Sequence, residues 1–239
     1  MLKKYAARLY WVPIFVLGSL YSVFLNISGK FGDSIITIFF LIGLLVYTFT
    51  QICKIHNQDL KASNRHNIFR LCIDITTLHL GVMVGMLVTS APDNVSWMID
   101  TYNLHLPMAT NVMETLQGKI NYIPTSHQGL GTHLWIGFLF YLFGKSIYTS
   151  IFGLHIIKLL TTIVVYKLGK AIWNEKAALY GAIIYGLSPM VFFYTFTFYK
   201  EGFVQLYVAL AYLFLVKSLF GRKHTYLIPF ICVLFALYI

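Results

Sequence analysis

Ionisable side chains gather in one polar stretch of the chain, residues 91–130, which cannot span a bilayer. The stretch contains three of the eight carboxylates and two of the eight histidines: Asp93, Asp100, Glu114, His105 and His127. Only 11% of all residues are charged, so this concentration between apolar segments predicts a functional site. A carboxylate at a membrane rim can act as a general base, and histidine or lysine can stabilise negative charge on a leaving group.

The composition of the chain indicates that most of it lies in a membrane rather than in water. Of the 239 residues, 58% are hydrophobic and 17% aromatic, and the mean hydropathy is +0.72, which is far too apolar for a soluble domain. The net charge of +10 does not indicate nucleic acid, because Lys and Arg are scattered through short connections and form no basic face. The three cysteines lie in or beside apolar segments, so neither a disulfide framework nor a zinc knuckle is predicted.

Apolar segments of bilayer length predict an all-α, polytopic transmembrane helical bundle of about seven spans, as a single domain over residues 1–239. The predicted spans are residues 9–27, 34–55, 71–90, 147–166, 177–196, 202–219 and a last run from about residue 226. Residues 91–146 form the predicted outer loop with juxtamembrane helices, because its apolar part at 129–144 is short for a span. Since the chain stops at Ile239 inside the last apolar run, we expect a truncated C-terminus.

The distribution of basic residues predicts the orientation of the spans. If residues 129–144 stay at the surface, most Lys and Arg face the cytoplasm. If that segment crosses the membrane, the numbers of Lys and Arg on the two sides become nearly equal. The positive-inside rule therefore favours the first arrangement, in which the N-terminus is cytoplasmic. We expect an integral membrane protein of a prokaryotic cell membrane, with Glu201 on the same outer side as Asp100.

The order of these features resembles the C-type integral membrane glycosyltransferases, especially the protein O-mannosyltransferase and lipid A aminoarabinose transferase branch. The resemblance is carried by Asp100, Tyr102 and the run HLPMATNVMETLQGK, by the segment GTHLWIGFLFYLFG, and by VVYKLGKAIWNEKAALYGAIIYGLSP. Glu201 follows Pro189 by 12 residues, as a second acidic residue does in that family. The resemblance covers residues 90–220 and corresponds to the N-terminal half of such an enzyme. The chain departs from the family in having Ser-His-Gln-Gly at 126–129 in place of a Lys-Pro-Pro-like motif, and two spans before the loop.

The resemblance implies transfer of a sugar from a polyprenyl-phosphate carrier to an acceptor on the extracytoplasmic face. Asp100 is then the catalytic base. Glu201 is the second acidic residue of the site, which orients the acceptor or shares a metal ion with Asp100. Residues expected to bind substrate, including the lipid phosphate, are Tyr102, His105, Lys119, His127 and Lys200. Whether a divalent ion is bound by Asp93, Asp100 and Glu201 stays open, because the spacing of these residues matches no standard ligand motif.

Plainer interpretations of the same residues also stay open. Asp100 is equally consistent with a solvated loop carboxylate or a helix N-cap, and Glu201 with a carboxylate that begins a helix. His105 is more typical of a hydrogen-bonded interfacial histidine than of a ligand.

Ionisable residues inside the predicted spans lead to other hypotheses. Asp74, His79, His155 and Lys158 are costly in hydrocarbon and must face protein or water. His155 and Lys158 share one helical face, where they either line a groove for the carrier lipid or hydrogen-bond to neighbouring helices. A transporter or flippase for a lipid-linked or anionic substrate would use Asp74, His155 and Lys158, with the outer loop as a gate. A truncated, non-catalytic remnant is the third hypothesis.

Overall fold

The structure is built from helices. The computed structural model describes residues 14–21, 35–56, 64–88, 104–121, 130–196, 201–220, 227, 229–231 and 233. All regular structure within these residues is helical and none of it is strand, which confirms the predicted all-α class.

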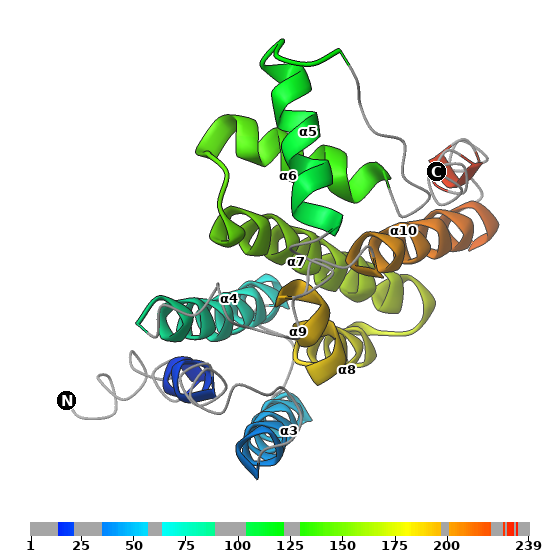
Figure 1. Cartoon of the computed structure of the whole chain (residues 1–239). Coiled ribbons are helices and arrows are strands. Elements are labelled where there is room, and N and C mark those ends of the chain that lie inside the picture. The colour runs from blue at the N-terminus through cyan, green and yellow to red at the C-terminus, as the bar shows by residue number, and fades with distance from the viewer. Residues whose placement is uncertain are drawn as a thin grey trace.

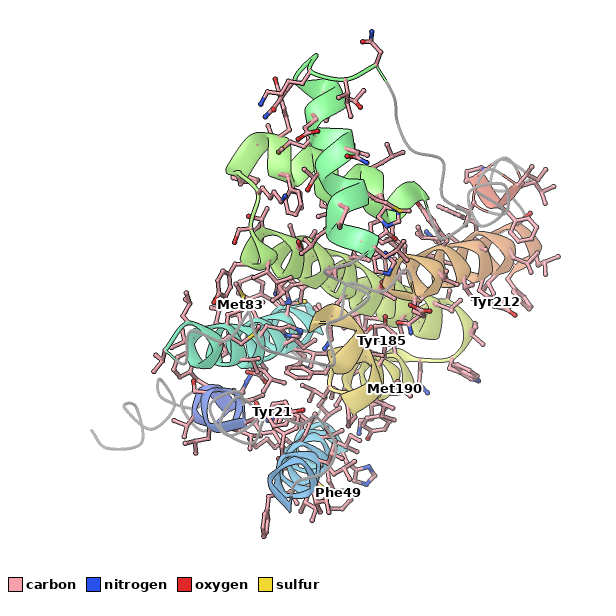
Figure 2. The ribbon with its side chains drawn as sticks, viewed as in Figure 1. Tyr21, Phe49, Met83, Tyr185, Met190 and Tyr212 are labelled. Atoms are coloured by element: carbon pink, nitrogen blue, oxygen red, sulfur yellow. The ribbon has the colours of Figure 1, made fainter. Side chains whose placement is uncertain are left out.

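Four of the described helices are long and apolar enough to cross a membrane: α3 (Ile35–His56), α4 (Asn64–Val88), α7 (Ile147–Ile172) and α10 (Glu201–Phe220). At 1.5 Å per residue they extend over about 30 to 39 Å, which matches or exceeds the hydrocarbon thickness of a bilayer. Large apolar side chains such as Phe49 on α3 and Tyr212 on α10 are exposed on the outside of the bundle, as lipid-facing residues would be (Figure 2). The total of about seven spans stays a prediction.

The central helix of the described bundle is α7, which carries the largest buried share of the four. Figure 1 shows α5 (Leu106–Leu116) and α6 (Leu130–Phe143) on one side of α7, and α4, α8 (Glu175–Gly186) and α9 (Pro189–Phe196) on the other. α7 begins at a standard cap, where the Ser146 side chain accepts a hydrogen bond from the backbone N–H of Tyr148.

The predicted span 177–196 is not one continuous helix but the pair α8 and α9. α8 ends at Gly186, where the backbone N–H of Leu187 still donates to the carbonyl of Ile183 over 3.0 Å. Pro189 has no N–H to continue this ladder and its ring disfavours helical backbone before it, so a new helix starts there.

α5 and α6 are the predicted short helices of the segment between the third span and α7. α6 has 14 residues, about 21 Å, and is therefore shorter than a span. It packs against α7, where the indole Nε1 of Trp135 donates to the carbonyl of Gly153 over 3.1 Å. α5 approaches α6 closely at Gly137, where a Cβ atom would lie 2.5 Å from the Cβ of Val112.

One end of the bundle is tied together by polar contacts near the α7–α8 turn. Lys170 and Glu175 form an ion pair of 2.8 Å, and the hydroxyl of Tyr166 donates to the same carboxylate. Lys176 at the start of α8 donates to the carbonyl of His56 at the end of α3 over 3.3 Å. The first turns of α10 lie near the other end of α8, because the Tyr185 hydroxyl donates to Oε1 of Gln205 over 2.7 Å.

Candidate functional site

Three of the predicted site residues lie within the described part of the chain: His105, Lys119 and Glu201. Five others lie outside the described residues: Asp93, Asp100, Tyr102, His127 and Lys200. Their roles therefore stay predictions. Among the described residues no group of three or more His, Cys, Asp or Glu side chains is placed to hold a metal ion. The predicted metal site involves Asp93 and Asp100 and is not tested by this observation.

Glu201 is the first residue of α10, where a negative charge interacts favourably with the helix dipole. The residue as a whole is half-buried, but its Oε2 atom is buried and has no hydrogen-bond partner among the described residues. A buried carboxylate oxygen without a donor is unfavourable, so this atom is available to a ligand, a water molecule or a side chain that moves.

A small cavity lies directly beside the start of α10. The space is about 10 Å³, close to what one water molecule needs, and its lining comes from α7, α8, α9 and α10: Leu154, Lys158, Tyr185, Val191, Thr195, Gly202 and Gln205. The hydroxyl of Tyr185 donates to Oε1 of Gln205 over 2.7 Å and thereby joins α8 to α10 (Figure 2 labels Tyr185). Helices that are far apart in sequence thus present polar groups to one space next to Glu201.

Lys158 supplies the positive charge in this cavity. Its side chain is 3% exposed, and its Nζ atom lies 5.2 Å from the centre of the Phe192 ring on α9. An ammonium over an aromatic ring gains a cation–π attraction, which offsets only part of the cost of burial. Within the described residues Nζ has no hydrogen-bond partner.

His155 and His79 continue the polar cluster from α7 into α4. The hydroxyl of Thr76 donates to the carbonyl of Cys72 over 2.8 Å, so it can only accept from His155 Nε2, which is 3.1 Å away. His155 therefore donates from Nε2, and its Nδ1 has no hydrogen-bond partner among the described residues. The His79 ring lies 4.5 Å from the His155 ring, and its Nδ1 donates to the Ile75 carbonyl over 2.8 Å.

His105 forms a buried pair with a histidine that was not among the predicted site residues. Its Nδ1 lies 2.9 Å from Nε2 of His133 on α6, and the two rings are stacked with centres 5.2 Å apart. One nitrogen must donate and the other accept, so the contact holds a single proton. Burial and the neighbouring His105 lower the pKa of His133 to about 4. The predicted substrate-binding role of His105 is not tested, but its Nδ1 is engaged in holding α5 against α6.

Lys119 lies just beyond the end of α5 and is exposed. Its backbone N–H donates to the carbonyl of Glu114 over 2.9 Å, which fixes the turn that ends the helix. Its predicted contact with a lipid phosphate stays a prediction.

A second cleft lies between α3, α4 and α8. It has a volume of about 390 Å³ and includes Lys54, Arg70 and Asp74 in its lining. The Oδ2 atom of Asp74 accepts a hydrogen bond from the Tyr47 hydroxyl over 2.9 Å. Asp74 therefore joins α4 to α3 through Oδ2, while its Oδ1 atom is buried and has no hydrogen-bond partner among the described residues.

Comparison with protein families gives a match over the region that contains α6 to α10. Residues 127–239 match the sequence model of the family described as Dolichyl-phosphate-mannose-protein mannosyltransferase. Over these residues the chain is similar to that family. The resemblance predicted from the sequence is confirmed here, and the match supports a membrane glycosyltransferase of mannosyltransferase-like type. No curated protein and no solved structure matches the chain.

The matched region covers somewhat less than half of the chain and contains the Lys158 cavity and Glu201, but not the loop residues Asp93, Asp100 and Tyr102. Two polar residues beside Glu201 were missed in the sequence, Tyr185 and Gln205. Gln205 could have been predicted from the sequence, because it lies four residues after Glu201 in an apolar helix and so shares its face. Tyr185 had none, since tyrosine is common throughout the chain.

Proposed function

We propose that the chain moves a sugar from a polyprenyl-phosphate carrier to an acceptor on the extracytoplasmic face of the membrane. The observation that carries the proposal is the match of residues 127–239 to a mannosyltransferase family. The predicted acidic residue Glu201 lies inside the matched region, at a helix start beside a small pocket, and its buried Oε2 atom has no hydrogen-bond partner among the described residues. Buried polar side chains of α4 and α7 also lie within this apolar bundle: His79, His155 and Lys158.

The proposed reaction is a displacement at the anomeric carbon of the sugar. Asp100 takes the proton of the acceptor group as the acceptor oxygen forms a bond to that carbon. The bond from the carbon to the phosphate oxygen breaks, and the electron pair leaves with the lipid phosphate. His127, Lys119 and Lys200 are the cationic groups proposed to stabilise this leaving charge.

Glu201 is proposed to orient the acceptor from the opposite side of the site. Its Oε2 atom has no hydrogen-bond partner among residues of the described part of the chain, so it can accept a hydrogen bond from a sugar or acceptor hydroxyl. The same atom is a chemically suitable ligand for a divalent ion shared with Asp93 and Asp100. The proposal does not depend on a metal ion.

The test measures sugar transfer by the full-length protein in proteoliposomes with a radiolabelled polyprenyl-phosphate sugar. We expect Asp100→Asn and Glu201→Gln each to lower transfer by at least about a hundredfold while membrane insertion stays normal, because positioned acid–base groups contribute roughly 10²–10⁴. Glu114→Gln on α5 is the matched control and should keep wild-type activity. Full activity of Asp100→Asn would remove that residue from the mechanism.

Transport of a lipid-linked or anionic substrate is the second candidate function. It is favoured by the burial of Asp74, His155 and Lys158 in helices of spanning length. Uptake of a polyprenyl-phosphate sugar into vesicles, without transfer to any acceptor and lost in Lys158→Met, would support transport and contradict the transferase proposal.

A further inference from the structure

The cleft between α3, α4 and α8 is polar and lies at the end of the bundle that the sequence predicts to be cytoplasmic. α3 and α4 each pack against α8, and the Tyr47 hydroxyl on α3 donates to Oδ2 of Asp74 on α4. About 40 Å³ of the cleft is space that water molecules can enter, which is room for about three of them. The cleft is only partly enclosed, so a ligand can reach it from outside the bundle.

The polar side chains of the cleft come from two helix faces that are turned toward each other. Gln51 and Lys54 lie three residues apart on α3, and Asn67, Arg70 and Asp74 follow the same side of α4. The two amides and the two cationic groups all carry N–H groups that can donate hydrogen bonds. The cleft therefore combines four potential donors with one carboxylate.

The charges in the lining do not cancel. Lys54 and Arg70 both interact electrostatically with Asp74, so two positive charges face one negative charge. Asp74 is 2% exposed, and its Oδ1 atom has no hydrogen-bond partner within the described residues. A buried carboxylate oxygen needs a donor, and a water molecule fits the available space. The outer part of the cleft is left with an excess positive charge that favours an anion.

The depth of the cleft indicates which anion can reach it. Lys54 and Arg70 lie at the ends of the predicted spans 34–55 and 71–90, which is the level of the lipid head groups. Phe49 and Phe69 on the same two helices are exposed, as side chains in contact with acyl chains would be. Basic pockets between spanning helices on the cytoplasmic side are typical binding sites for the head groups of anionic lipids.

We infer that this cleft binds the head group of an anionic phospholipid from the cytoplasmic leaflet. The phosphodiester accepts hydrogen bonds from Lys54 and Arg70 and from the amides of Gln51 and Asn67, and one water molecule joins it to Oδ1 of Asp74. The bound lipid links α3 to α4. This inference does not depend on sugar transfer, because the cleft lies at the end of the bundle opposite to the proposed catalytic surface.

Lipid binding to the purified full-length protein in detergent tests the site without an activity assay. Native mass spectrometry should show one phosphatidylglycerol molecule bound at least about fivefold more tightly than phosphatidylcholine, which has the same phosphate but no net charge. Inorganic phosphate at the same concentration should not displace the lipid. Displacement by inorganic phosphate would assign the cleft to a soluble phosphate and overturn the lipid site.

Single substitutions locate the binding. Lys54→Gln and Arg70→Gln should each weaken the binding of phosphatidylglycerol about fivefold or more, because each removes one positive charge and its hydrogen bonds. Lys167→Gln is the matched control, since Lys167 is exposed on α7 at the same predicted side of the membrane and does not line the cleft. Equal losses for Lys54→Gln and Lys167→Gln would mean that general surface charge attracts the lipid, and would overturn the site.

Asp74→Asn changes the charge of the cleft in the opposite direction. Its amide oxygen can still accept from the Tyr47 hydroxyl, and the variant removes the negative charge that opposes the phosphate. The affinity for phosphatidylglycerol should therefore rise about fivefold, a gain that general destabilisation of the protein would not produce. Weaker binding by a folded Asp74→Asn protein would contradict an anion site.

Discussion

The hydrogen bond between His105 and His133 contains a single proton. One nitrogen donates to the other over 2.9 Å, and adding a second proton would place two N–H groups face to face. Burial and His105 lower the pKa of His133 to about 4, so the neutral pair persists at neutral and mildly acidic pH. His105 was identifiable in the sequence, but its partner 28 residues later was not, because no periodicity links two short helices across a connection.

This pair predicts a specific loss of stability in acid. The unfolded His133 has an ordinary pKa near 6.5 and takes up a proton before the folded form does. Stability is therefore complete above about pH 6.5 and declines as the pH falls toward 4, by up to roughly 3 kcal/mol. Thermal unfolding between pH 7 and 4 should show a steeper decline for the wild type than for His133→Gln. Identical curves for wild type and His133→Gln would contradict the assignment of the acid loss to the buried pair.

At the level of helices, the contact between α5 and α6 depends on one residue without a side chain. A Cβ at Gly137 would lie 2.5 Å from Val112 Cβ and 2.7 Å from the Ala109 carbonyl oxygen, and the latter is backbone that cannot move aside cheaply. The requirement is for close packing, because α5 and α6 each bury one face against the other.

Gly137→Ala should destabilise the protein by about 1–3 kcal/mol, the usual cost of overpacking. Gly181→Ala on α8 is the matched control, because a Cβ there meets only Val165 at 3.8 Å. In that variant the helix propensity of Ala should leave stability unchanged or raise it by up to about 1 kcal/mol. Equal unfolding midpoints for the two variants would show that α5 and α6 do not pack as described.

Hydropathy located the long helices well and the break between α8 and α9 poorly. The predicted spans 34–55, 71–90, 147–166 and 202–219 correspond to α3, α4, α7 and α10, because bilayer-length apolar runs carry a strong signal. Composition did not reveal the break before Pro189, since proline also occurs inside transmembrane helices. α7 continues past Lys167 to Ile172, because a basic residue ends an apolar run without ending a helix.

For the molecule as a whole, the proposed chemistry requires Asp100 and Glu201 to face the same aqueous side. The positive-inside rule predicts this sidedness from the sequence. Asp100 lies outside the described residues, so its position stays a prediction. The cavity of Lys158, Tyr185 and Gln205 could not be predicted, because it depends on how α7, α8 and α10 pack against each other.

Cysteine labelling in intact cells tests the sidedness. In a background without Cys53, Cys72 and Cys232, a membrane-impermeant maleimide should modify Asp100→Cys and Glu201→Cys before the cells are permeabilised. Lys176→Cys at the start of α8 should react only afterwards, because that end of the bundle is predicted to be cytoplasmic. Reaction of Asp100→Cys and Glu201→Cys from opposite sides would rule out a shared site.

The most direct measurement of the central claim compares sugar donors with the purified full-length protein in proteoliposomes. Transfer of radiolabel from a polyprenyl-phosphate sugar to an acceptor fraction, with none from the corresponding nucleotide sugar, is the predicted result. Transfer from the nucleotide sugar alone, or none from either donor by a correctly folded and inserted protein, would contradict the account.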